Sequence, residues 1–498
     1  MKRILTSAIA VLMFGTAAFA NTVANDGDAA KETKKQKKEV KYNENGEIIK
    51  TGTNFGPLPV VAFDADRGFQ FGGLLNLYNF GNGDTYPNPK STWYFEASAY
   101  TKESTINSYK FIVNYDNKTL IPGVRMSICS GYYKDAALDF YGFNGYQSNY
   151  DMELVEKNLI FSDDKAGEKL QNKFDKKGKL PKGFYRHGRD LIKIKADFTG
   201  EILKNFYWEA GYSFSWAKTQ QFDPKGYTVF PGANLGDGYV GTSLFDLYKA
   251  WGIIPEDQAD GGIVSALKAG LMYDSRDIEN NPTKGIWAEA HVIAAPEWLG
   301  TSDGHYKYCA TFRHYVPIIK DGKLTFAYRI AYQGTFGNNS PWYTLPFYTN
   351  MGPKADNDGF GGYRTVRGLM LNRVQGLDVG FYNAEFRWRF VDFKLFNQNI
   401  AFALSAFTDG AHVFKGYDMT FSDEAKAKLL LADPVTGAAK AALYDKFVLD
   451  RKDGFHASAG GGLRFIMNQN FIVAFEYARC FNKQDGNGAF YINTGFLF

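Results

Sequence analysis

Several side chains in this sequence are of types that carry out enzymatic chemistry, but their spacing forms no catalytic pattern. No serine lies in a Gly-x-Ser-x-Gly nucleophile turn, and no histidines have the His-Glu-x-x-His spacing of a zinc site. Asp356 and Asp358 precede Gly359 as in a calcium loop, but the bidentate glutamate of such a loop is missing. The six histidines are His187, His291, His305, His314, His412 and His456. We therefore predict that the protein is not an enzyme and that it has no catalytic residue, no metal and no cofactor.

The composition narrows the fold class. The chain has 498 residues, of which 45% are hydrophobic, 17% aromatic and 22% charged, with 52 glycines. So many aromatic residues exclude a largely disordered chain, and three widely spaced cysteines exclude a disulfide scaffold. After the first twenty residues no run of eighteen apolar residues occurs, which excludes a helical membrane protein. A mean hydropathy of -0.33 suits a soluble protein or a β-barrel with alternating strands.

The first twenty residues have the three parts of a secretory signal peptide. Lys2 and Arg3 form a basic start, residues 4–14 are mostly apolar, and residues 18–20 read Ala-Phe-Ala, a cleavage pattern. We therefore predict that residues 1–20 are removed and that the mature protein is exported. Loss of the two cations lowers the formal charge from +4 to +2, which argues against a nucleic-acid partner.

Residues 21–54 are polar and rich in lysine, especially over residues 31–38, and they lack a hydrophobic period. We predict a solvated, disordered periplasmic tail. The segment is too short for a globular domain. Docking of a separate periplasmic partner on the basic run is the alternative interpretation.

From residue 57 onward the dominant pattern has a period of two residues, which predicts strands. In residues 383–390, for example, Phe386 and Trp388 share one face, whereas Glu385 and Arg387 share the other. A soluble sandwich buries the apolar face, but a membrane barrel turns it toward lipid and places charges in the lumen. Alternation alone does not separate the two folds, so strand number and loop length must decide.

The alternation predicts sixteen strands, and the lengths of their connections favour a barrel. If the N-terminus is periplasmic, every odd-numbered connection faces outside. The long connections, near residues 135–186, 219–261, 338–375 and 411–453, follow strands five, seven, eleven and thirteen. Short periplasmic turns and long outer loops are typical of an outer-membrane barrel. We therefore predict an all-β fold, a 16-stranded antiparallel transmembrane β-barrel of the outer membrane over residues 55–498, in contact with outer-membrane lipid.

The last predicted strand, residues 487–498, places alternate residues on one face: Phe490, Ile492, Thr494, Phe496 and Phe498. An alternating strand that closes on phenylalanine resembles the C-terminal signal recognised by the outer-membrane assembly machinery. We therefore predict that this machinery is a partner during biogenesis, and that recognition works by strand addition at an open sheet edge.

One outer loop carries the motif that suggests a family. Residues 345–348 read Leu-Pro-Phe-Tyr, Gly361 and Gly362 follow, and then come Val366, Arg367 and Gly368. This set resembles the sixth outer loop of the BamA/TamA-like bacterial surface-antigen superfamily of outer-membrane barrels, which includes the two-partner-secretion transporters. Leu369 stands where the family has an aromatic residue. The loop follows predicted strand eleven, which is its place in the family.

Three other segments resemble the same family. Residues 273–285 look like its periplasmic D-x-R-D…N-P-x-x-G turn, residues 407–414 like its thirteenth strand, and residues 458–465 like its fourteenth. In the family the loop arginine pairs with lumen carboxylates. The resemblance therefore implies that Arg367 binds Glu385 and Asp409, and the planar guanidinium suits such bidentate pairing.

The resemblance implies a role in outer-membrane protein or lipid assembly or translocation. Relatives with that role carry periplasmic POTRA domains, and we predict a member that lacks them. The short first strand, residues 57–63, implies a weak seam with the last strand, the lateral gate proposed for the relatives. A channel or transporter that kept the fold is the main alternative, and a surface-adhesion barrel displaying its long loops is the third.

Overall fold

A computed structural model describes residues 41–42, 46, 48–64, 68–102, 105–150, 182–221, 243–353, 357–469 and 471–498. The predicted signal peptide and most of the Lys-rich segment lie outside these residues. The described end of that segment is ordered against the barrel, because Ile48 is buried and its backbone amide donates to Asn399 Oδ1 (3.1 Å). The first strand begins at Thr53, so the predicted solvated tail ends earlier than residue 54.

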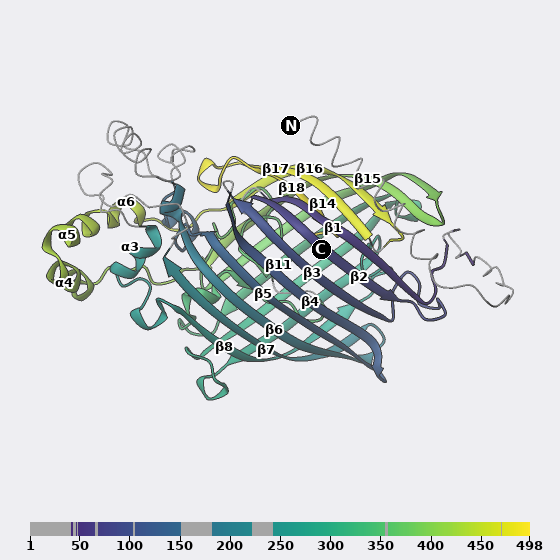
Figure 1. Cartoon of the computed structure of the whole chain (residues 1–498), viewed down its shortest axis with the longest axis horizontal. Coiled ribbons are helices and arrows are strands. Elements are labelled where there is room, and N and C mark those ends of the chain that lie inside the picture. Colours follow the sequence, from purple (N-terminus) through teal and green to yellow (C-terminus); the bar gives the residue numbers. More distant parts are fainter. Residues whose placement is uncertain are drawn as a thin grey trace, which may run out of the picture.

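Sixteen antiparallel strands form one sheet in which each strand pairs with its neighbours in sequence, rolled into a barrel (Figure 1). The prediction of a 16-stranded antiparallel barrel is confirmed. The strands are β1 (Thr53–Asp64), β2 (Gly68–Asn79), β3 (Ser91–Lys102), β4 (Thr105–Ile121), β5 (Val124–Asp139), β6 (Arg186–Leu203), β7 (Phe206–Gln221), β8 (Gly261–Asp274), β9 (Gly285–Ala295), β10 (His305–Ile319), β11 (Leu324–Thr335), β14 (Asp378–Leu395), β15 (Gln398–Lys415), β16 (His456–Met467), β17 (Phe471–Cys480) and β18 (Ala489–Thr494).

The alternation has the orientation of a membrane barrel. On β14, Phe386 and Trp388 are each 50% exposed on the outer face, whereas Glu385 is fully buried in the lumen. This is the reverse of a soluble sandwich, and it is the pattern that lipid requires. No helix of the described residues is long and apolar enough to span a membrane.

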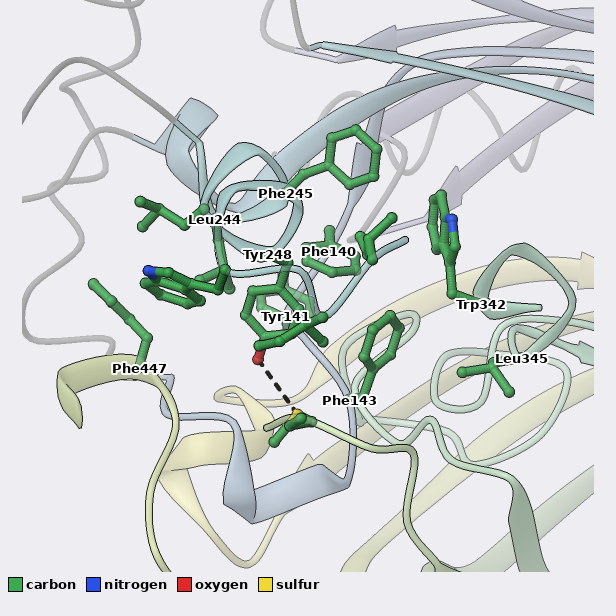
Figure 2. Packing of buried hydrophobic residues seen from close by; sticks show 14 of the residues in the cluster. Phe140, Tyr141, Phe143, Leu244, Phe245, Tyr248, Trp342, Leu345 and Phe447 are labelled. Carbon is green, nitrogen blue, oxygen red and sulfur yellow. Dashed lines mark hydrogen bonds between the residues drawn. The ribbon is translucent and has the colours of Figure 1, made fainter. Parts of the chain in front are cut away.

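The described parts of the connections predicted to be outer loops fold into a cap beyond one end of the barrel (Figure 1). Phe140, Phe245, Tyr248, Trp342 and Phe447, which come from four different loops, pack into one buried aromatic core (Figure 2). The cap contains α3 (Leu244–Ala250), α4 (Asp423–Ala432), α5 (Pro434–Ala442) and α6 (Tyr444–Phe447), together with the 3₁₀ helices η1 (Gly145–Gln147), η2 (Lys182–Tyr185), η3 (Glu256–Gln258) and η6 (Trp342–Thr344). The other 3₁₀ helices are η4 (Glu297–Leu299), η5 (Lys320–Gly322) and η7 (Lys483–Asp485). This packing makes the cap a folded unit at that end of the barrel.

The last strand is shorter than its sequence pattern predicts. β18 ends at Thr494, because Gly495 adopts a positive φ of 86°, which interrupts the extended backbone. Phe496 and Phe498 then contact lumen arginines, and Phe498 is only 2% exposed. The prediction that Phe490, Ile492, Phe496 and Phe498 share one face of a continuous strand is therefore wrong for the last two residues.

Candidate functional site: the anchored loop in the barrel lumen

The loop between β11 and β14 turns inward on glycines that carry the predicted motif. The loop also contains the two-residue strands β12 (Phe347–Tyr348) and β13 (Asn357–Asp358), which pair with each other. Gly361 has φ 106°, and a Cβ there would lie 2.1 Å from the Met370 carbonyl oxygen. Gly368 has φ 92° and packs against Ala478 of β17. Gly362 pairs with Val366, which is fully buried, in an isolated β-bridge. These conformations bring Arg367 into the lumen.

Arg367 is fully buried and binds both carboxylates named from the sequence. Its Nε donates to Asp409 Oδ2 (2.8 Å) and its Nη2 to Asp409 Oδ1 (3.0 Å), a bidentate pair. Its Nη1 donates to Glu385 Oε2 (2.9 Å). The guanidinium also lies 3.4 Å from the centre of the Phe407 ring. The structure therefore brings Arg367, Glu385 and Asp409 together as the family resemblance implies.

Three further charged residues complete this cluster, and the sequence did not identify them as partners. Arg367 Nη1 donates to Glu476 Oε1 (2.8 Å), and Arg464 Nη2 lies 2.6 Å from Glu476 Oε1 and 2.8 Å from Glu385 Oε1. Arg387 Nε lies 3.2 Å from Glu385 Oε1. The alternation of each strand could have indicated them, because each of the three residues lies at a lumen-facing position of its own strand. Three arginines thus face three carboxylates, and this balance makes their burial tolerable.

The loop backbone is also held by the strands around it. Gly368 N donates to the Tyr491 hydroxyl of β18 (3.0 Å), and Cys480 Sγ of β17 donates to the Gly368 carbonyl (2.8 Å). The Ser458 hydroxyl of β16 donates to the Arg367 carbonyl. The anchor therefore ties the loop to β14 through β18, which are the last five strands of the sheet. It contains no nucleophile beside a base, so its chemistry is ion pairing and positioning.

A second polar network joins the outer loops above the anchor. The His456 ring lies between Asp453 Oδ1 (3.0 Å) and Asp485 Oδ1 (2.6 Å), and it stacks on Tyr146 at 4.0 Å between ring centres. The Tyr146 hydroxyl donates to Asp485 Oδ2 (2.6 Å). Burial of the Asp453 carboxyl opposes ionisation, but the hydrogen bond and charge of His456 outweigh it and lower the Asp453 pKa. This network fastens together the loops between β5 and β6, between β15 and β16, and between β17 and β18.

The mouth of the barrel opposite the cap, which we predict to be periplasmic, is crossed by the turn between β8 and β9, residues 275–284, which we call the strap. Its Glu279 accepts hydrogen bonds from Lys118 Nζ (2.6 Å) and Arg125 Nη2 (2.5 Å), while the Glu279 amide donates to Asn88 Oδ1 (3.2 Å). Asn281 donates to Gln469. The strap, which follows β8, thus contacts the turn after β2 and the turn after β16. Burial of Glu279 favours its neutral form, but the two cations and Arg276 hold its pKa well below the usual range.

A cavity of about 570 Å³ occupies the lumen between the cap and the strap. Its wall includes Lys193 and Arg364, and also Val60 of β1 and Ile492 of β18. The cavity therefore reaches the place where the two ends of the sheet meet. Among the described residues no group of histidine, cysteine and acidic side chains is arranged to hold a metal. Asp356 of the calcium-like segment lies outside those residues.

The fold, the alternation and the anchored loop together define a transmembrane β-barrel of the outer membrane. A family model described as the Omp85 superfamily domain matches residues 137–498, so the chain belongs to the Omp85 superfamily. Barrels of this family lie in the outer membrane, and members such as BamA and CdiB are non-enzymatic assembly or translocation proteins. The resemblance to BamA/TamA-like proteins inferred from the loop motif is thereby confirmed.

Two solved structures illustrate the likeness. BamA from Haemophilus ducreyi lacking POTRA domains 1-3 is 14% identical, with 92% of this chain and 74% of that chain covered and a TM-score of 0.46. CdiB from Escherichia coli is 10% identical, with 90% and 63% covered and a TM-score of 0.48. The chain therefore spans less than two thirds of that CdiB. No curated protein matches the sequence.

Proposed function

We propose that this barrel inserts or translocates proteins at the outer membrane, and that client strands enter at the seam between β1 and β18. The observation that carries the proposal is the state of that seam. β1 and β18 lie next to each other (Figure 1), yet among the described residues no hydrogen-bonded ladder joins them. An unpaired strand edge is a template for another strand.

Two prolines in β1 support an open edge. Pro57 and Pro59 have the same parity, so both nitrogens point to the same side of the strand. Because β1 pairs with β2 in an unbroken register through both positions, and because proline cannot donate to a ladder, we place these nitrogens on the side that faces β18. The β1 edge then lacks two donors that a closed seam would use.

β18 supports the same proposal from the opposite side of the seam. It has only six residues, against twelve in β1, so half of β1 has no partner of matching length. The lumen cavity, with Val60 and Ile492 in its wall, extends to this gap. A client strand that paired with β1 would satisfy backbone groups that β18 leaves open.

The two covered mouths argue against a passive channel. The aromatic cap folds over the outer end, and the strap crosses the periplasmic end. A steady conductance would require both to open. No observation favours the adhesion alternative. The outer-membrane assembly machinery, through which the barrel itself would be inserted, remains a predicted partner, and so does a periplasmic protein on the Lys-rich run.

Depletion of the protein followed by quantitative proteomics of the outer membrane tests the proposal. We expect a defined set of other barrels or secreted proteins to decline, and that set would name the clients. Complementation with the Pro57→Val/Pro59→Val variant, which restores the missing donors, should rescue less than the wild type. Pro317→Val, a change in β10 away from the seam, is the matched control and should rescue fully. An unchanged membrane proteome after depletion would reject the function.

A further inference from the structure

The tip of the anchored loop presents one cation to the lumen cavity. Between Gly361 and Leu369, Arg364 is the only exposed residue, and it forms part of the cavity wall. Its backbone is fixed, because its carbonyl oxygen accepts a hydrogen bond from Arg329 Nη2 (3.3 Å) and the next residue, Thr365, is fully buried. The guanidinium group, in contrast, forms neither an ion pair nor a hydrogen bond among the described residues. The loop therefore holds a charge in the cavity that no side chain uses.

Every aspartate and glutamate in the cavity wall already has a cationic partner. Glu96 Oε1 lies 3.0 Å from Lys110 Nζ. Asp116 accepts two hydrogen bonds from Arg125 (2.7 and 2.9 Å), and Glu279 of the strap accepts a third from the same arginine. The wall contains seven lysine and arginine residues against these three carboxylates. The cavity surface therefore carries an excess of positive charge, and the cation at the loop tip is not balanced by a carboxylate of the wall.

One neutral acceptor near this cation is also unused. The Arg364 charge lies within electrostatic range of the Tyr94 hydroxyl of β3 and of Lys110 Nζ of β4. Asn114 of β4 stands directly opposite Tyr94 in the ladder, and both residues line the cavity. Asn114 Oδ1 is buried and has no hydrogen-bond donor among the described residues. A buried acceptor without a donor is unfavourable, so a ligand hydroxyl that donated to Asn114 would be bound favourably.

We propose that this part of the lumen cavity binds a small hydroxylated phosphate, with Arg364 as the main phosphate-binding residue and Asn114 as the acceptor for a ligand hydroxyl. A planar guanidinium donates two parallel hydrogen bonds to phosphate oxygens. The cavity volume of about 570 Å³ falls in the range of about 300–1,000 Å³ typical of small-molecule sites. Glycerol phosphate has the required chemistry, either as a free solute or as the headgroup of an anionic lipid.

A phosphate in this position would join the loop tip to a second part of the barrel wall. The anchor at Arg367 ties the loop to β14 through β18, whereas Lys110 and Asn114 belong to β4. The anchor does not supply the site, since its own arginines and carboxylates pair with one another. A ligand that binds the folded barrel and not the unfolded chain also stabilises the fold. Binding should therefore raise the unfolding temperature.

Calorimetric titration of the purified full chain in a phosphate-free maltoside detergent tests the site. The probe is glycerol 3-phosphate, and glycerol is the neutral comparison. We expect one molecule of the probe to bind, with an affinity that falls as salt is added, and no binding of glycerol. Arg364→Gln should weaken binding at least tenfold, and Arg364→Lys should lie between this variant and the wild type. Arg479→Gln removes an exposed charge of β17 that is not part of the cavity wall; it is the matched control and should bind as the wild type does.

Two further measurements separate the roles of the residues. Asn114→Leu should weaken binding of glycerol 3-phosphate at least threefold and leave binding of inorganic phosphate, which has no glycerol hydroxyl, unchanged. The probe should also raise the unfolding temperature of the wild type and of Arg479→Gln, but not that of Arg364→Gln. Because Arg364 has no partner to lose among the described residues, Arg364→Gln should unfold near the wild-type temperature when no probe is present. If it does not fold, Arg364→Lys gives the same comparison, with an expected loss of at least threefold.

The two sources of the phosphate are distinguished with a short-chain lipid, dihexanoylphosphatidylglycerol, used below its micellar concentration. Binding of this lipid at least tenfold more tightly than glycerol 3-phosphate, and dependent on Arg364, would identify a lipid headgroup; tighter binding of glycerol 3-phosphate would identify a free solute. Either result upholds the site. Three outcomes would overturn it: no binding of either probe at millimolar concentration, equal binding of glycerol, or equal binding by Arg364→Gln and Arg479→Gln. The site does not depend on the proposed insertion function, so an unchanged membrane proteome after depletion would leave it standing.

Discussion

Replacement of Arg367 by alanine is the most direct test of the loop anchor. The change removes four charge-assisted contacts, two to Asp409, one to Glu385 and one to Glu476. Glu385 and Glu476 keep Arg464 as a partner. Asp409 keeps no arginine of the cluster, so a fully buried carboxylate is left with much less compensation. Removing one partner of a buried ion pair costs about 3–5 kcal/mol, and we expect a loss of stability in this range.

The assay is unfolding of the purified barrel by heat and by urea in one detergent, followed by tryptophan fluorescence. Arg367→Lys keeps the charge but loses the bidentate pair, so it should lie between the wild type and Arg367→Ala. Arg367→Ala/Asp409→Asn removes the stranded carboxylate and should recover part of the loss. Arg389→Ala, a partly exposed arginine at the barrel rim, is the control and should stay near the wild type. Unfolding of Arg367→Ala at the wild-type temperature and urea concentration would refute the anchor.

Three further predictions follow from the strap, the outer face and the cap. The pKa of Glu279 is lower in the folded protein than in the unfolded chain. The ionised Glu279 therefore stabilises the fold above the unfolded pKa of about 4.3, and this stabilisation is lost as the pH falls through the folded pKa. Glu279→Gln should abolish this acid dependence of the unfolding free energy, and an unchanged pH profile would contradict the prediction. Phe386→Lys, on the lipid face, should cost about 2–4 kcal/mol in barrel stability in the same unfolding assay. Asp453→Asn should loosen the cap, and faster proteolysis of the outer loops should reveal this, while cleavage matching the wild type would show that the network does not hold the loops.

Strand number, strand orientation and the loop motif were predictable because they depend on local chemistry. Alternation in residues 383–390 separates Phe386 from Glu385 whatever the distant partners are, and the structure places them on opposite faces. The pairing of Arg367 with Glu385 and Asp409 came from the family motif, which carries information about contacts across strands. No periodicity in a single strand contains that information.

Features that depend on packing between distant segments were not predictable in the same way. Glu476 has lumen parity on β17, but nothing local indicates that it meets Arg367 109 residues away. The aromatic cap joins side chains from four loops whose sequences show no common pattern. The alternation of residues 487–498 predicted a full strand, and one glycine with positive φ redirected it. There the cation–π contacts of Phe496 and Phe498 with lumen arginines outweigh the local preference for a strand.

The segment after β18 and the loop anchor share one set of charges. Arg387 contacts both Phe498 and Glu385, and Glu385 contacts Arg367. Loss of the Phe496 and Phe498 rings would remove part of the packing that holds the Arg387 guanidinium, and a shift of this group would weaken its ion pair with Glu385. The cluster balances three arginines against three carboxylates, so any such shift changes the compensation of Arg367 as well. The position of the segment after β18 and the seating of the loop are therefore linked through Arg387 and Glu385.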